Sequence, residues 1–138
     1  MLAISAALMG ADEILAVDID PNAIEQAQEN RDDFEDSLPI DFIQHDICSA
    51  PDCCPVTWAD VVVTNPPFGT RRKGADVAFL QTAFSIAETA VYSLHKRSTR
   101  QHLEKVAHRD PRVSSSNVIA ELRYNLPALY KFHRHRRT

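Results

Sequence analysis

The chain has 138 residues, 44% of them hydrophobic and 25% charged, which suits one domain with a single core. No apolar run approaches the roughly 20 residues that a membrane-spanning helix needs, so we expect no membrane partner. The three cysteines, two of them adjacent, fit neither a disulfide framework nor the usual spacing of zinc ligands. We therefore expect free thiols and no metal.

The net charge of −4 conceals a strong asymmetry along the chain. Residues 1–70 contain 14 acids and one base, a net charge of −13, whereas residues 71–138 contain 5 acids and 14 bases, a net charge of +9. This segregation predicts a basic surface for a polyanion and an acidic surface elsewhere, unless folding interleaves the two halves.

Apolar runs rich in β-branched residues predict strands, and apolar residues at helical spacing predict helices. In chain order we expect a helix ending at Gly10, a strand at 14–20, a helix from Pro21, a strand at 40–46, a loop at 48–57, a strand at 58–64, a helix at 76–89, a strand at 90–94, a helix from Ser98 to about Arg109, and a strand at 117–124. The alternation of strands and helices predicts an α/β fold with a parallel sheet.

Two helix starts carry capping signals. Asp20-Pro21 places a capping carboxylate before a proline in the first turn. Ser98 and the Gln101 that follows it three residues later have the spacing of a capping box.

The most informative motif is Asn65-Pro66-Pro67-Phe68, directly after the predicted strand at 58–64. Two prolines stiffen the loop, and ligands bind at the carboxyl ends of strands in open α/β sheets. The motif matches the loop of S-adenosylmethionine-dependent methyltransferases that modify planar amino groups. A turn that ends in a core phenylalanine is the structural alternative.

The order of these residues suits methylation of an exocyclic amino group. The side-chain oxygen of Asn65 and the carbonyl of Pro66 can accept its two hydrogens, so that the nitrogen lone pair points at the methyl group. Phe68 offers a face on which a base can stack, and the help to the reaction is positioning and electrostatics. We take Asn65, Pro66, Pro67 and Phe68 as the candidate catalytic residues.

Acids that follow two other predicted strands are candidates for cofactor binding. Asp18 can accept hydrogen bonds from both ribose hydroxyls, although Asp18 and Asp20 could instead form a capping pair. Asp46 can accept from an adenine amino group, with Ile47 behind the ring, although an aspartate that ends a strand is by itself more typical of a turn.

The basic triplet Arg71, Arg72 and Lys73 follows the motif and could hold a nucleic-acid backbone through its phosphates. A solvated charged loop is the alternative. The basic tail at 127–138 could bind RNA, act as a localisation signal or be a disordered end. We expect the domain itself to cover residues 1–126.

Four segments together resemble the methyltransferase-like protein five family, the eukaryotic N6-adenine methyltransferases of small-subunit ribosomal RNA. These segments are VDIDPNAIEQAQEN, HDI at 45–47, NPPFGTRRKGADVAFLQTAFSIAETAVYSLHKRSTR and IAELRYNLPALYKFH. The resemblance implies a Rossmann-like fold, S-adenosylmethionine as cofactor, and contacts to it from Asp18, Asp46, Ile47 and Asn65. It also implies an RNA substrate, localisation to the nucleus, nucleolus and cytoplasm, and a small zinc-binding activator subunit that pairs with the strand at 40–45.

The chain departs from the family in its amino-terminal part. Family members begin with a first strand and a glycine-rich loop, neither of which is found here, and the chain contains only three glycines. In the family's sheet that strand lies between the strands at 14–20 and 58–64, so we expect a partial domain with two unpaired inner edges. We accordingly expect weak cofactor binding by this chain.

The sequence thus predicts an N6-adenine methyltransferase that acts on RNA. Two alternatives stay open. The same motif serves methylation of a glutamine side-chain amide in a protein, and a truncated domain could be a non-catalytic module that binds RNA or a partner.

Overall fold

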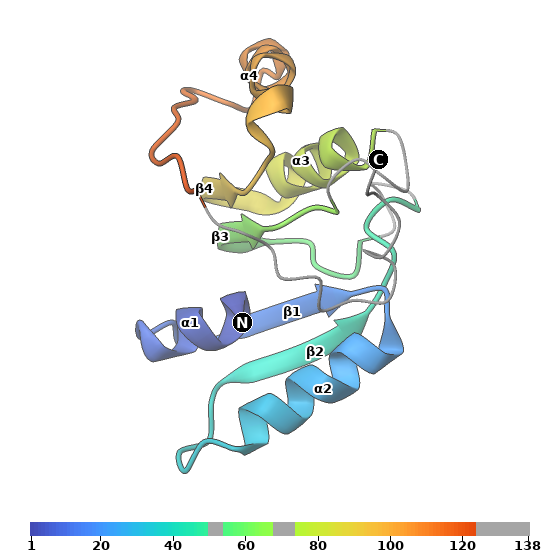
Figure 1. The fold of residues 1–138 in the computed structure, drawn as a ribbon, viewed down its shortest axis with the longest axis vertical. Helices are drawn as coiled ribbons and strands as arrows, with labels where there is room; N and C mark the ends of the chain where they lie inside the picture. Colours follow the sequence, from blue (N-terminus) through green and yellow to red (C-terminus); the bar gives the residue numbers. More distant parts are fainter. Residues whose placement is uncertain (50–53, 68–73, 124–138) are drawn as a thin grey trace.

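The computed structural model describes residues 1–49, 54–67 and 74–123. Figure 1 shows its helices and strands. The elements are α1 (Leu2–Leu8), β1 (Ile14–Asp18), α2 (Pro21–Asp32), β2 (Ile40–Gln44), β3 (Ala59–Thr64), α3 (Ala75–Ile86), β4 (Ala87–Ser93), the 3-10 turn η2 (Arg97–Thr99) and α4 (Arg100–Arg109).

The strands form two parallel pairs, which confirms the α/β class. β1 pairs with β2, with Asp18 opposite Gln44, and β3 pairs with β4, with Thr64 opposite Ser93. Among the described residues no ladder of strand hydrogen bonds joins the two pairs. Figure 1 draws β1 and β3 as the inner strands of the two pairs. The expectation that these two strands do not pair with each other is therefore confirmed.

Asp20 begins α2 as the sequence predicts. Its Oδ1 accepts hydrogen bonds from the backbone N–H of Asn22 at 2.9 Å and from the side-chain amide of the same residue at 3.1 Å. Pro21 occupies the first helical position, where its missing N–H leaves no bond unmade.

Helix α1 ends at Leu8, and the left-handed position two residues later is filled by a glycine. Gly10 has a φ of +92°, its N–H donates to the carbonyl of Ala7, and the N–H of Ala11 donates to the carbonyl of Ala6. This pair of bonds is the Schellman arrangement, which satisfies carbonyls at the end of a helix.

Several expected boundaries are wrong, with the largest shift at the junction of α3 and β4. Helix α3 stops at Ile86 instead of residue 89, because residues 87–89 already belong to the strand that pairs with β3. The spacing of apolar residues along the chain does not reveal this tertiary pairing. Strands β1 and β2 also end two residues earlier than expected, at Asp18 and Gln44.

The capping box at Ser98 does not form. Thr99 is the residue that precedes α4, and its hydroxyl donates to the carbonyl of Lys96 at 2.9 Å instead of capping the helix. A 3-10 turn over 97–99 occupies the place of the expected first turn.

Residues 117–123 do not form the expected last strand. Ile119 and Leu122 are 78% and 69% exposed. Alternation of apolar residues can define a face, but a strand also needs a hydrogen-bonded neighbour, and none of the described strands pairs with this segment. Residues 124–138, with the basic tail, lie outside the described residues.

The described core is small and consists of aliphatic side chains. Its members, each less than 9% exposed, are Ile4, Ile40, Val56, Ala75, Leu80, Ala83, Leu103 and Ala107. None of the described helices is both long enough and apolar enough to cross a membrane.

Among the described residues, an acidic and a basic segment lie apart in the fold. Residues 1–49 contain 12 acids and one base, for a net charge of −11, and residues 94–112 contain 6 bases and 2 acids, for +4. Figure 1 places α2 and β2 at one end of the longest axis and α4 at the other. The structure therefore segregates the two charges in space.

Candidate active site

The edge formed by the carboxyl ends of β1 and β2 brings two predicted acids together. Asp18 is the last residue of β1 and is exposed, and its carbonyl accepts from the N–H of His45 at 2.9 Å. Asp46 comes directly after His45, just beyond the end of β2. Because the two strands are parallel, both carboxylates lie at the same edge of this sheet.

Asp18 and Asp20 have separate structural roles. The Oδ1 of Asp18 accepts from the N–H of Asp20 at 2.9 Å, whereas Asp20 caps α2. The interpretation that Asp20 is the cap is confirmed. Asp18 presents an exposed carboxylate beside the helix start, where it can accept hydrogen bonds from ligand hydroxyls.

Asp46 has the geometry of a turn residue. Its Oδ1 accepts from the N–H of Cys48 at 2.8 Å, and its carbonyl accepts from the hydroxyl of Ser49 at 2.7 Å. The turn interpretation of Asp46 therefore holds. A contact from this carboxylate to a cofactor stays a prediction, as does the packing of the half-buried Ile47 against a ring.

The start of the Asn-Pro-Pro-Phe motif lies directly after β3. Asn65 is exposed, Pro66 is buried and Pro67 is exposed. The carbonyl of Thr64, the preceding residue, accepts from the N–H of Leu94 at 3.0 Å. This bond ties the start of the motif to the end of β4 and leaves the Asn65 side chain open to solvent.

Some predicted site residues cannot be placed. Phe68 and the basic triplet Arg71, Arg72 and Lys73 lie outside the described residues. Asn65 also lies at the end of a different strand pair from Asp18 and Asp46.

The structure adds a polar pair that the sequence reasoning did not assign to the site. The hydroxyl of Ser93 and the Nε2 of His95 are 2.6 Å apart, at the end of β4 opposite Thr64. Burial lowers the pKa of His95, and the nearby Asp76 carboxylate partly offsets this effect. The signal available in the sequence was two polar residues at the end of a predicted strand, and that is too common to be diagnostic.

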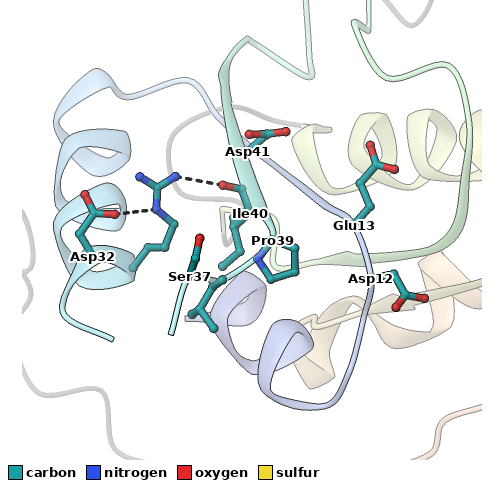
Figure 2. Close-up of a pocket in the computed structure, with 9 residues that line it drawn as sticks. Asp12, Glu13, Asp32, Ser37, Pro39, Ile40 and Asp41 are labelled. Carbon is teal, nitrogen blue, oxygen red and sulfur yellow. Dashed lines mark hydrogen bonds and ion pairs between the residues drawn. The ribbon is translucent and has the colours of Figure 1, made fainter. Parts of the chain in front are cut away.

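A pocket lies at the opposite edge of the first strand pair, where β1 and β2 begin. Figure 2 shows this pocket of about 590 Å³, which is lined by carboxylates from Asp12, Glu13, Asp32 and Asp41. The Arg31 guanidinium donates to Asp32 at 2.8 Å and to the carbonyl of Ile40 at 3.1 Å. These residues surround the amino ends of β1 and β2, so the pocket is separate from the edge that carries Asp18 and Asp46.

No group of three or more His, Cys, Asp or Glu side chains suited to a metal ion occurs in the part of the chain that the structure describes.

Comparison with known proteins defines the family. The model described as "RMKL-like, methyltransferase domain" matches residues 2–110, which is most of the chain. The chain belongs to this methyltransferase family. The predicted methyltransferase family and Rossmann-like α/β fold are thereby confirmed.

Curated relatives give a narrower similarity. The chain is 48% identical over 136 residues to the zebrafish (Danio rerio) rRNA N(6)-adenosine-methyltransferase METTL5, and the match covers 97% of this chain and 63% of that protein. It is 38% identical to the Drosophila melanogaster protein of the same description, covering 97% of this chain and 62% of that one. The chain thus spans less than two thirds of the length of these relatives.

A solved structure supports the fold. A crystal structure from Pyrococcus horikoshii, described as that of an inferred RNA methyltransferase, superposes with a TM-score of 0.63 at 33% identity. The superposition covers 78% of this chain and 50% of the archaeal one.

Proposed function

We propose that this chain carries the catalytic loop of an S-adenosylmethionine-dependent N6-adenine methyltransferase that acts on ribosomal RNA. The observation that carries the proposal is the position of Asn65-Pro66-Pro67, directly after β3 with Asn65 exposed and Pro66 buried. The zebrafish and fly relatives are described as rRNA N(6)-adenosine methyltransferases, which supports the choice of substrate.

The motif would act by orienting the adenine amino group. The Oδ1 of Asn65 and the carbonyl of Pro66 would accept its two hydrogens, so that its lone pair points away from the loop. The amino lone pair is otherwise delocalised into the ring, so positioning is the main contribution that these residues can make. Phe68 would stack on the base, as proposed from the sequence.

The residues at the edge of β1 and β2 fit one half of the cofactor. Asp18 offers an exposed carboxylate to ribose hydroxyls, and Asp46 with Ile47 would hold the adenine. S-adenosylmethionine supplies the electrophilic methyl group when it is bound. The methionine half has no glycine-rich cradle in the described residues, because Gly10 and Gly74 lie at a helix end and a helix start.

The partners implied by the resemblance are part of the proposal. The outer edge of β2 carries no paired strand among the described residues, so it can accept a strand from the small zinc-binding activator subunit. We place the protein in the nucleus, nucleolus and cytoplasm, where ribosomal RNA is made and used. Imaging of a tagged protein tests that placement.

Two other functions compete with this one. Methylation of a glutamine amide in a protein would use the same loop, because that nitrogen is also planar. The basic end around α4 favours a polyanionic substrate over a peptide. A non-catalytic module that binds RNA is the second competitor, and it differs only in the absence of methyl transfer.

The test is methyl transfer from a radiolabelled donor to two substrates, a ribosomal RNA fragment and a glutamine-containing peptide, with the activator subunit present. We expect label on the RNA and a strong loss with Asn65→Ala. Asn30→Ala is the matched control, because Asn30 is an exposed asparagine on α2, which packs on the other strand pair, β1 and β2. Label on the peptide, or on neither substrate, contradicts the proposal.

A further inference from the structure

The solvent face of α4 carries bases without acids. Lys105 and Arg109, one helical turn apart, are exposed, and so are the flanking His102 and His108. Helical geometry places these four side chains on the side opposite Leu103 and Ala107, which are buried.

The acidic residue of α4, Glu104, already forms an ion pair within the chain. Glu104 is half-buried and pairs with Arg100 at 3.0 Å, and Arg100 pairs again with Glu121 at the same distance. Lys105 and Arg109 form no ion pair with any described residue. The charge on this face is therefore available to an outside partner.

Helix stability alone does not explain this arrangement. The helix dipole favours bases in the last turn, which accounts for His108 and Arg109. Lys105 and Arg109 are like charges at i and i+4, however, which costs about 0.2–0.5 kcal/mol. A bound anion would remove this repulsion.

The face is also continuous in the chain with the candidate site. The N–H of Leu94 donates to the carbonyl of Thr64, the residue before Asn65. Lys96 and Arg97 follow two and three residues later and lead into α4. Two residues span at most about 7 Å, so the basic segment begins close to the catalytic loop.

We propose that the α4 face, defined as Lys105, Arg109, His102 and His108, binds the phosphate backbone of RNA beside the target adenine. The proposal rests on the proposed function, and it names the surface that positions the substrate. It would hold the RNA without reading its sequence, because phosphate contacts position and base contacts specify.

A second copy of the chain is the competing occupant, because its α2 end is strongly acidic. We favour RNA, because the segment that leads into the face starts beside the catalytic loop, and because the face lies at the end of the molecule remote from the acidic segment (Figure 1). Regularly spaced phosphates also match two bases about 6 Å apart along a helix axis.

The experiment measures the salt dependence of binding to a fluorescently labelled, 20-nucleotide single-stranded RNA. The double variant Lys105→Gln with Arg109→Gln should make the negative slope of log K against log salt shallower by about 1.4, which is about 0.7 for each lost phosphate contact. Circular dichroism should show unchanged helix content, because Leu103 and Ala107 are retained.

The matched control is Ala23→Glu with Gln28→Glu, which shifts the net charge by the same amount on exposed positions of α2. It should leave the slope unchanged. An unchanged slope in the α4 variant, or an equal fall in both variants, overturns the proposal. So does sedimentation in which the α4 variant abolishes association between copies while RNA binding stays the same.

The outcomes separate this inference from the proposed function. RNA binding that depends on the α4 face, without methyl transfer, refutes the function and supports the inference. Methyl transfer to RNA, with a salt slope that is the same in the α4 variant as in the parent chain, supports the function and refutes the inference.

Discussion

Asp18 and Asp20 are two residues apart, and the structure gives them different tasks that substitution can separate. Asp20 accepts from the N–H and side-chain amide of Asn22 at the start of α2, whereas the Asp18 carboxylate accepts from the N–H of Asp20. We expect Asp20→Ala to change stability and Asp18→Ala to change cofactor binding.

The stability effect of Asp20→Ala follows from the lost cap. Removal of an aspartate cap costs about 1 kcal/mol, and both bonds here are exposed, so the middle of the range applies. An entropy of unfolding of about 2.1 cal/mol/K per residue gives about 0.3 kcal/mol/K for a chain of this length. The expected fall in Tm is therefore about 3 °C. Asp20→Asn should restore most of it, because asparagine caps almost as well.

The effect of Asp18→Ala should appear in ligand binding. Water can replace the exposed bond to the Asp20 N–H, so the free energy of unfolding should change by less than about 0.5 kcal/mol. Two hydrogen bonds from ribose hydroxyls to a carboxylate are worth about 3 kcal/mol together, so affinity for S-adenosylmethionine should fall about a hundredfold.

Urea and thermal unfolding followed by circular dichroism measure the first effect, and calorimetric titration in the presence of the activator subunit measures the second. A stability loss confined to Asp18→Ala would refute the assignment of the cap. Equal losses of affinity in the two variants would refute the assignment of the ribose contact.

Three further predictions concern stability and its dependence on pH. Gly10→Ala should destabilise the chain by about 1–2 kcal/mol, because the φ of +92° is unfavourable for any residue with a Cβ, and chemical denaturation measures the loss. Leu103→Ala should cost about 2–5 kcal/mol because Leu103 anchors α4 with 6% exposure, whereas the exposed Gln101→Ala should be nearly neutral; a similar Tm for the two variants would contradict the packing. Burial holds the pKa of His95 below 6.5, so the unfolded chain binds a proton first as the pH falls below 6.5 and the free energy of unfolding decreases there; His95→Asn should flatten this part of the pH profile.

Local sequence signals predicted several elements because their causes are local. The Asp20-Pro21 cap, the glycine that ends α1 and the strands that contain Val17 and Val62 all depend on residues within one turn or one run. The motif at Asn65 was also readable, since its chemistry depends on residue order after a strand.

Tertiary contacts decided the element boundaries that local sequence signals could not predict. Ala87 continues the apolar spacing of α3, yet it starts β4 because β3 offers a partner there. Residues 117–123 have a strand-like pattern and form no strand, because no described strand pairs with them.

The sequence by itself determined the family, the motif and the uneven distribution of charge, because each is a property of residue identity and order. Only the tertiary structure decided that the described acidic segment 1–49 and basic segment 94–112 reach opposite ends, and that α4 turns Lys105 and Arg109 outward. The reason is physical. The order of charges along a chain is fixed by its covalent sequence. Which charges reach the surface depends on packing: the burial of Leu103 and Ala107 turns one face of α4 inward and leaves the opposite face in solvent.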